Sequence, residues 1–128
     1  MPRALGALSD TLLTLKSDAR PEVWQKTAVI ALTEFGRTAR ENGTDGTDHG
    51  TGGLMVLAGG AIRGGVIHCD WPSVAPDALY DRRDLMPTRD VRAQAAWIMR
   101  GITGIATGHL ERDVFPGLTM GTNPGLLL

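Results

Sequence analysis

A carboxylate and a histidine stand next to each other in a glycine-rich stretch of this chain, as Asp48 and His49. Carboxylate oxygens and neutral imidazole nitrogens are the protein groups that bind divalent ions such as zinc, manganese or calcium. The stretch follows an apolar run at residues 29–32 that predicts a buried strand, and open α/β sheets place their sites beyond the carboxyl ends of strands. The pair therefore predicts part of a metal-dependent hydrolase site, with a surface turn capped by Asp48 as the alternative.

Two further residues near the end of the same strand could contribute to such a site. Glu34 could reach into a crevice as a third metal ligand, or remain an exposed loop carboxylate. Arg37 could hold an anionic substrate group through a bidentate contact, and an ion pair with Glu34 or Glu41 is the alternative. Asn42 and Asp45 are expected to order the loop through bonds from side chain to backbone.

Other groups of polar side chains are weaker candidates. Neighbouring residues of a strand point to opposite faces, so of His68, Cys69 and Asp70 only the first and the last could share a site. The glycine-rich run 59–65 lacks the Lys-Ser or Lys-Thr pair of a phosphate-binding loop, and it predicts a turn. The charged run 81–84 predicts a solvated cluster, although one of its arginines could face an anionic ligand.

Composition narrows the class of protein. With 128 residues the chain is one domain or a piece of a larger one, and its hydrophobic fraction of 42% is ordinary for globular proteins. A net charge of -1 gives no basis for non-specific binding of nucleic acid. The first twenty residues hold no apolar run typical of a signal peptide, and no run approaches the ~20 residues of a membrane span. Seventeen glycines and 5% aromatic residues indicate much loop and few bulky core residues.

The spacing of apolar residues predicts an α/β chain. Helical spacing predicts helices over residues 3–16 and 88–101, with Thr88 as the cap of the second. Apolar runs predict strands at 27–33 and 54–58, and a short third strand at 66–68. The first run does not alternate with polar residues, which is typical of strands covered on both faces in parallel sheets. We expect the first two strands to share one sheet and both helices to cover it.

The polar segment 36–53 is predicted to be one long loop, and loops of this length in compact domains are usually functional or disordered. We expect it to turn back over the end of the first strand, which would bring Glu34, Asp48 and His49 within the reach of one ion. Residues 118–128 are expected to form a frayed tail.

Several short runs together resemble the bacterial family called domain of unknown function 1501. The resemblance covers about residues 27–117, nearly in order, and is specific. Its clearest pieces are Thr33-Glu34-Phe35-Gly36-Arg37-Thr38, Gly46-Thr47-Asp48-His49-Gly50, Asp70-Trp71-Pro72, Tyr80-Asp81-Arg82-Arg83-Asp84-Leu85 and Thr88-Arg89-Asp90-Val91-Arg92.

That family is similar to sulfatases and alkaline phosphatases. The resemblance therefore implies an alkaline-phosphatase-like α/β fold, of which this chain would be a C-terminal fragment forming a single partial domain. Within it, residues 1–26 would be a helix and linker, residues 27–117 the family-like region and residues 118–128 the tail. Members are longer and are often exported to the periplasm through the twin-arginine pathway, which leaves the location of this chain open.

The resemblance also implies a site. Asp48 and His49 match the family's Asp-His-Gly motif, and Glu34 lies at the strand end where relatives often place a carboxylate ligand. Phe35 departs from the pattern, because several relatives carry a histidine there. The implied cofactor is a divalent metal, zinc, manganese or calcium, and the implied substrate is a phosphate or sulfate ester whose anionic group Arg37 would hold.

The nucleophile and the early metal-binding aspartates would lie in an N-terminal half that this sequence does not contain. The chain alone is therefore expected to be inactive. The alternative is a non-catalytic binding or structural protein that keeps the fold after losing the chemistry.

Overall fold

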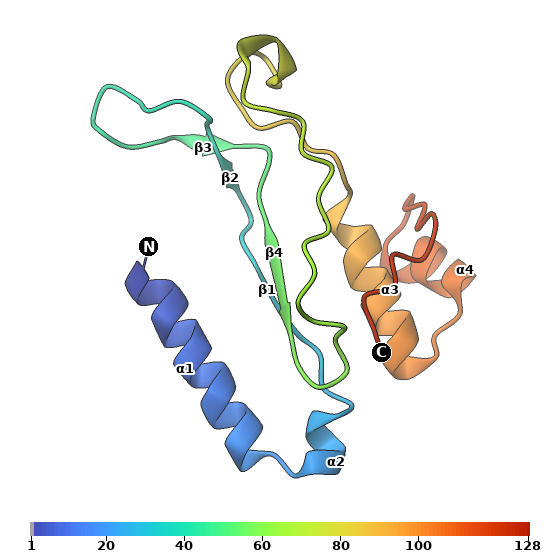
Figure 1. Cartoon of the computed structure of the whole chain (residues 1–128). Helices are drawn as coiled ribbons and strands as arrows, with labels where there is room; N and C mark the ends of the chain where they lie inside the picture. Colours follow the sequence, from blue (N-terminus) through green and yellow to red (C-terminus); the bar gives the residue numbers. More distant parts are fainter. Residues whose placement is uncertain (1) are drawn as a thin grey trace.

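The computed structural model describes residues 2–128 and combines helices with two small antiparallel sheets, so the chain is broadly α/β (Figure 1). The two main strands and the two long helices of the sequence prediction all form, within a few residues of their expected bounds. In chain order the elements are α1 (Pro2–Asp18), α2 (Pro21–Trp24), β1 (Val29–Leu32), β2 (Gly36–Arg37), β3 (His49–Gly50), β4 (Met55–Ala58), the 3-10 turn η1 (Pro76–Ala78), α3 (Val91–Thr103), α4 (Thr107–His109) and the π-helical turn η2 (Leu110–Val114).

Strands β1 and β4 pair with each other, as expected, but they run antiparallel, with Val29 opposite Ala58 and Leu32 opposite Met55. The parallel arrangement that the unbroken apolar run suggested is therefore wrong. Parallel neighbours need a long crossover connection, usually a helix, whereas the chain between β1 and β4 forms a hairpin. The predicted third strand at 66–68 does not form, and that segment is exposed.

The segment 36–53 is not one unbroken loop, because a second pair of strands, β2 and β3, joins its ends with Gly36 opposite Gly50. A Cβ atom on Gly36 would lie 1.9 Å from the carbonyl oxygen of Gly52, so only glycine allows this close approach. The resulting arm projects beyond the end of β1 instead of turning back over it (Figure 1). The sequence-predicted site residues are therefore carried on or beside a projecting hairpin.

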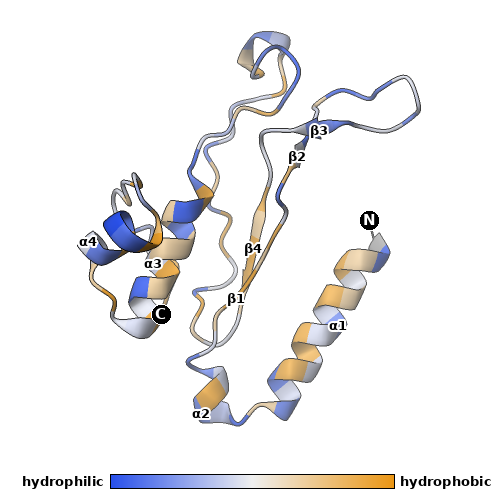
Figure 2. Ribbon diagram, turned by 180° about the vertical axis from the view of Figure 1, so that it is seen from behind, coloured by the Kyte–Doolittle hydropathy of each residue, from blue (hydrophilic) through white to orange (hydrophobic). Residues whose placement is uncertain are grey.

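The two long helices lie on opposite sides of the hairpin in both views (Figures 1 and 2). Helix α1 runs beside β1 and β4 and is exposed along most of its length. Helix α3 begins one residue after Asp90, whose Oδ1 accepts a hydrogen bond of 2.8 Å from the amide of Arg92. Asp90 is therefore the N-cap in place of the predicted Thr88. The helix ends at Thr103, and Gly104 caps it with a φ of 76° in the left-handed region.

The hydrophobic core lies in the C-terminal part of the chain. Ala93 and Ala96 of α3 pack against Leu110, Leu118 and Met120, with partly buried residues around them. The expectation that both helices cover the sheet is therefore wrong for α3, which buries its apolar face against the segment that follows it.

The end of the chain is docked, so the predicted frayed tail is also wrong. Leu126 is buried and its carbonyl accepts a hydrogen bond of 2.9 Å from the amide of Arg63, while Leu127 forms a β-bridge with Ile62. These pairings tie the last residues to the turn that follows β4.

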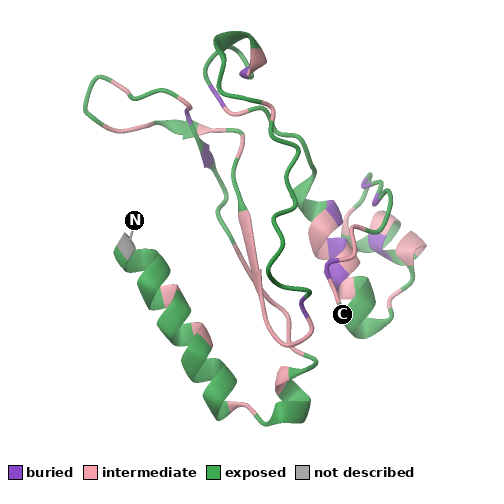
Figure 3. Cartoon of the chain, viewed as in Figure 1, coloured by how far each residue is buried: buried purple, intermediate pink, exposed green. Residues whose placement is uncertain are grey.

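Burial is distributed unevenly along the chain (Figure 3). Among the described residues before Ile62, the only buried ones are Gly36 and Thr38, and neither is hydrophobic. Within residues 2–128 no helix combines the length and the apolar character needed to cross a bilayer.

Candidate functional site

The arm formed by β2 and β3 places Arg37 directly opposite His49, and an ordered loop closes its tip. Asn42 organises that loop: its Oδ1 accepts hydrogen bonds from the amide of Thr44 at 3.0 Å, the hydroxyl of Thr44 at 2.9 Å and the amide of Gly46 at 3.0 Å. The prediction that Asn42 orders the loop through side-chain bonds is thus confirmed.

Asp48 is held at the base of this loop by contacts on its backbone and on its carboxylate. Its amide donates to Thr38 Oγ1 at 3.2 Å, and its carbonyl accepts from the amide of Thr38 at 3.1 Å. The side chain of Asn42 donates to Asp48 Oδ1 at 2.8 Å. Asp48 is exposed, so its carboxylate is oriented by the protein and still open to solvent.

His49 follows on β3 and is also exposed. Its ring is stacked on Phe35, with centroids 4.2 Å apart and ring planes 10° apart. Stacking fixes the plane of the imidazole and leaves the nitrogens at its edge free to bind a ligand. Phe35, which directly precedes β2, therefore supports one face of the His49 ring.

Arg37 forms neither of the two ion pairs considered from the sequence. Its Nε donates to Thr47 Oγ1 at 2.9 Å, and its Nη2 donates to the carbonyl of Thr47. Nη1 takes part in neither bond. Glu34 is exposed between β1 and β2 and forms no side-chain hydrogen bond or ion pair within the described residues.

The arm places Arg37 opposite His49, with Asp48 next to His49 in the chain, and it does not bring Glu34 into a ligand cluster with them. Within residues 2–128 no group of three or more histidine, cysteine, aspartate or glutamate side chains is arranged to hold a metal ion. One oriented carboxylate and one oriented imidazole suit part of a divalent-ion site. The remaining ligands would have to come from outside this cluster.

Asp84 is a buried acid that the sequence placed in a solvated charge cluster, and that prediction is wrong for this residue. It is 3% exposed and forms a β-bridge with Thr38 of the arm. Arg83 Nη2 donates to Asp84 Oδ2 at 3.2 Å. Arg83 Nε lies 2.8 Å from Oδ1 as an ion pair without hydrogen-bond geometry, so the buried Oδ1 has no hydrogen-bond donor.

Arg83 is a charged group beside the candidate ligands. The hydrogen bond to Asp84 and the charge of Asp84, with smaller contributions from the charges of Asp48 and Asp81, raise the pKa of Arg83. On the arm, the backbone N–H of Ala39 donates a hydrogen bond of 2.9 Å to the carbonyl of Arg83. The 80–85 turn is therefore attached to the arm, and it brings a guanidinium toward the Asp48 carboxylate.

The turn that presents Arg83 has a strained backbone. Asp81 and Arg82 are consecutive non-glycine residues with φ values of 48° and 55°, and the amide of Arg83 donates to the carbonyl of Tyr80 at 3.0 Å. Left-handed conformations cost roughly 1–2 kcal/mol for residues with a Cβ atom. Strain of this kind persists only where the surrounding structure holds it, and it clusters at functional sites.

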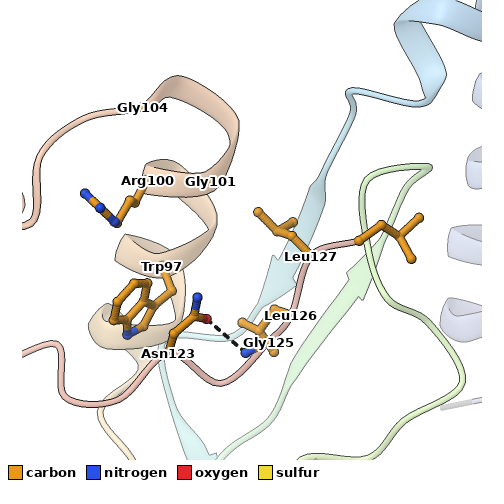
Figure 4. A pocket seen from close by; sticks show the side chains of 9 residues that line it. Trp97, Arg100, Gly101, Gly104, Asn123, Gly125, Leu126 and Leu127 are labelled. Atoms are coloured by element: carbon orange, nitrogen blue, oxygen red, sulfur yellow. Dashed lines mark hydrogen bonds between the residues drawn. The ribbon is translucent and has the colours of Figure 1, made fainter.

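A separate hollow of about 360 Å³ lies between α3 and the C-terminal segment (Figure 4). Three of its polar groups are bonded within the chain: Trp97 Nε1 donates to the carbonyl of Met120 at 3.0 Å, Arg100 Nη1 to the carbonyl of Ile105 at 3.2 Å, and Gly125 N to Asn123 Oδ1 at 2.9 Å. None of the sequence-predicted site residues lines it. We therefore assign the candidate site to the arm and the 80–85 turn.

Comparisons with known proteins bear on the whole of this region. No curated protein and no solved structure matches the chain. A family model described as "Protein of unknown function (DUF1501)" matches residues 1–95, which include α1, both small sheets, the arm and the 80–85 turn. The matched part is about three quarters of the chain, and the chain therefore belongs to the DUF1501 family.

Proposed function

We propose that this chain is the C-terminal part of a sulfatase-like or phosphatase-like metal-dependent hydrolase. In this proposal Glu34, Asp48 and His49 contribute metal ligands, and an alkaline-phosphatase-like fold is completed by an N-terminal half that carries the nucleophile. The sequence resemblance to the relatives of that superfamily supports the proposal. The lack of buried apolar side chains among described residues before Ile62 fits a fold that is only partly present.

The observation that carries the proposal is the presentation of Asp48 and His49. The two donors are adjacent, exposed and oriented independently, Asp48 by Asn42 and His49 by Phe35. Oriented ligands favour metal binding because little freedom is lost when the ion arrives. A bound divalent ion would supply Lewis acidity and orientation to a phosphate or sulfate ester.

The cationic groups would act on the anionic part of the ester. Arg37 is fixed by its two bonds to Thr47 while Nη1 stays available, which is the arrangement expected of a residue that holds an ester oxygen. Arg83 is held in its charged form by Asp84 and could assist from the neighbouring turn. The described residues near these groups include no serine, threonine or cysteine with an activating base, so the nucleophile is assigned to the absent half.

A non-catalytic binding or structural protein is the second candidate, and one specific observation favours it. Phe35 covers one face of the His49 ring where several relatives are expected to carry a further histidine. Asp48 Oδ1 is at the same time engaged by Asn42. A protein that had lost its metal would keep both contacts as packing and loop structure.

Calorimetric titration of the chain with zinc, manganese and calcium separates the two candidates. We expect weak binding of at least one ion, which His49→Ala and Asp48→Asn abolish and the matched control His109→Gln leaves intact, because His109 lies far along the chain on α4. Failure of all three ions to bind would favour the non-catalytic candidate. Binding that persists in His49→Ala would contradict the assignment of the site.

Hydrolysis of aryl phosphate and aryl sulfate esters by the same preparations tests the second half of the proposal. We expect little or no turnover with any of the three metals, because no nucleophile accompanies the donors. Robust metal-dependent turnover that is lost in His49→Ala would show that the chain is a complete enzyme.

A further inference from the structure

Arg83 carries a guanidinium that is held along one edge and open along another. Its Nε lies 2.8 Å from Asp84 Oδ1 and its Nη2 donates to Asp84 Oδ2 at 3.2 Å, so Asp84 occupies the edge between Nε and Nη2. Nη1 takes part in neither contact. The side chain of Arg83 is 60% exposed, whereas that of Asp84 is 4% exposed. The edge between Nη1 and Nη2 is therefore available to a ligand, and its geometry matches two oxygens of a tetrahedral oxyanion.

Asp84 holds this guanidinium from a fixed point of the fold. It forms antiparallel bridges with Tyr80 across the turn and with Thr38 of the arm. Its amide and carbonyl are each bonded to the backbone of Tyr80 at 3.0 Å, and the carbonyl of Arg83 accepts from the amide of Ala39 at 2.9 Å. Because the backbone and the acid are both held, Arg83 has lost part of its freedom before a ligand arrives. Such preorganisation lowers the entropic cost of binding.

The open edge of Arg83 lies next to the carboxylate of the candidate metal site. The amide of Thr38 donates to the carbonyl of Asp48 at 3.1 Å on one side, and Thr38 bridges Asp84 on the other. Neighbouring segments of a sheet lie about 5 Å apart, so the backbones of Asp48 and Asp84 are about 10 Å apart. A side chain as long as that of Arg83 can therefore reach an oxyanion held between them.

The charges around Arg83 set a condition for anion binding. The carboxylates of Asp48, Asp81 and Asp84 all act on Arg83, so negative groups outnumber the guanidinium. They repel an incoming oxyanion. A divalent ion at Asp48 cancels two of these negative charges, and the ion and the guanidinium then attract the same oxyanion. Binding of the ion and of the oxyanion should therefore strengthen each other.

The neighbouring arginine of the turn does not share these features. Arg82 pairs with Asp77 at 3.5 Å, and their side chains are 80% and 89% exposed. Exposed ion pairs of this kind are weak and do not fix a side chain. Of the two arginines in the 81–84 run, Arg83 is therefore the one placed to face an anionic ligand, and Arg82 is a matched control.

We propose that Arg83 binds two oxygens of a phosphate or sulfate monoester beside an ion at Asp48, and that the buried Asp84 is the residue that positions Arg83. The class of ester follows from the count of free oxygens. Two oxygens meet the guanidinium and a third meets the ion, and a monoester has three unesterified oxygens whereas a diester has two. The proposal rests on the proposed function, because it needs the ion at Asp48.

Calorimetric titration of the full chain with methyl phosphate and with methyl sulfate tests the proposal, in the presence of whichever of zinc, manganese and calcium the chain binds. At least one monoester should bind at least about fivefold more tightly with the ion than without it. The monoester that binds identifies the ester as phosphate or sulfate. Arg83→Gln should weaken this binding roughly tenfold, and Arg82→Gln should leave it unchanged.

Three outcomes of this titration would overturn the proposal. They are equal affinity of the wild type and Arg83→Gln, equal affinity for methyl phosphate or methyl sulfate and for the diester dimethyl phosphate, and full affinity in Arg83→Lys, which keeps the charge and loses the paired donors. An ion that binds at Asp48 and His49 with no gain from either monoester would overturn the assignment of Arg83 and leave the metal site intact. Failure of all three ions to bind would overturn both.

Asp84→Asn tests the positioning role, because its effects through charge and through position have opposite signs. Removing a negative charge by itself favours an anion, so a fall in monoester affinity in this variant indicates lost positioning. NMR should show faster exchange of the Arg83 Nε proton, while the amide of Ala39 stays protected and the ion still binds. Unchanged monoester affinity would overturn the role of Asp84, and so would loss of Ala39 protection together with ion binding, since Asp84 would then only hold the turn in place.

Discussion

Replacing Asn42 with alanine should loosen the tip of the arm by an amount that can be worked out from its bonds. The side chain accepts from two backbone amides, those of Thr44 and Gly46, each at 3.0 Å, and it donates to Asp48 at 2.8 Å. A hydrogen bond contributes about 0.5–1.5 kcal/mol net, and about 1.4 kcal/mol is a tenfold change in an equilibrium. The amides of Thr44 and Gly46 should therefore exchange with solvent roughly 2- to 12-fold faster in Asn42→Ala.

Hydrogen–deuterium exchange followed by NMR measures these two amides directly, and a second variant separates the roles of the side chain. Asn42→Asp keeps the oxygen that accepts from the loop amides and loses the nitrogen that holds Asp48, so the two amides should stay protected. Glu41→Ala, in the same loop, should leave exchange unchanged. Equal exchange in the wild type and Asn42→Ala, or equal acceleration in both Asn42 variants, would refute the reasoning.

Three further outcomes follow from the geometry of the turn and of α3. Arg82→Gly should raise the melting temperature, because Arg82 has a left-handed φ of 55° and removing this strain gains roughly 1–2 kcal/mol. The greater entropy of glycine in the unfolded chain costs only about 0.5–1 kcal/mol. A lower melting temperature would contradict this. Asp90→Ala should cost about 1 kcal/mol in urea denaturation at neutral pH, because the cap of α3 is lost. The hydrogen bond with Arg92 lowers the pKa of Asp90 from 3.8, so the Asp90 charge stabilises the fold above pH 3.8 and this stabilisation is lost as the pH falls through the folded-state pKa. Asp90→Asn keeps the cap, so its stability should approach that of the wild type in acid. A difference in stability between the two that does not change with pH would argue against the pairing of Asp90 with Arg92.

The local elements of this chain were predictable because local patterns determine them. The leucine spacing correctly predicted α1, and the apolar runs correctly predicted β1, β4 and their pairing in one sheet. Their relative direction was not predictable from the runs themselves, because an unbroken apolar strand suits a parallel sheet and a short hairpin strand equally. The need for glycine at Gly36, where the backbone approaches that of Gly52, becomes apparent only once the partner strand is known.

The predictions that proved wrong concern features that depend on contacts between residues far apart in the sequence. The docked tail rests on the pairing of Leu127 with Ile62, and the burial of Asp84 rests on its bridge to Thr38. A run of two arginines between two aspartates is typical of a solvated surface, so nothing in the run itself distinguished Asp84 from Asp81. For the site, only the adjacency of Asp48 and His49 in a glycine-rich segment after the strand was predictable, whereas the projecting arm, the stacking of Phe35 on His49 and the engagement of Arg37 by Thr47 required the structure.

Paramagnetic broadening by manganese in the NMR spectrum of the full chain is the measurement that tests the central claim most directly. Bound manganese broadens signals near it, and calcium serves as the diamagnetic reference. The proposal predicts that the signals of Asp48 and His49 broaden first, that Glu34 follows them, and that His49→Ala removes the effect while His109→Gln does not. Broadening centred elsewhere, or uniform broadening that ignores His49→Ala, would contradict the assignment of the arm as a metal-binding part of a hydrolase.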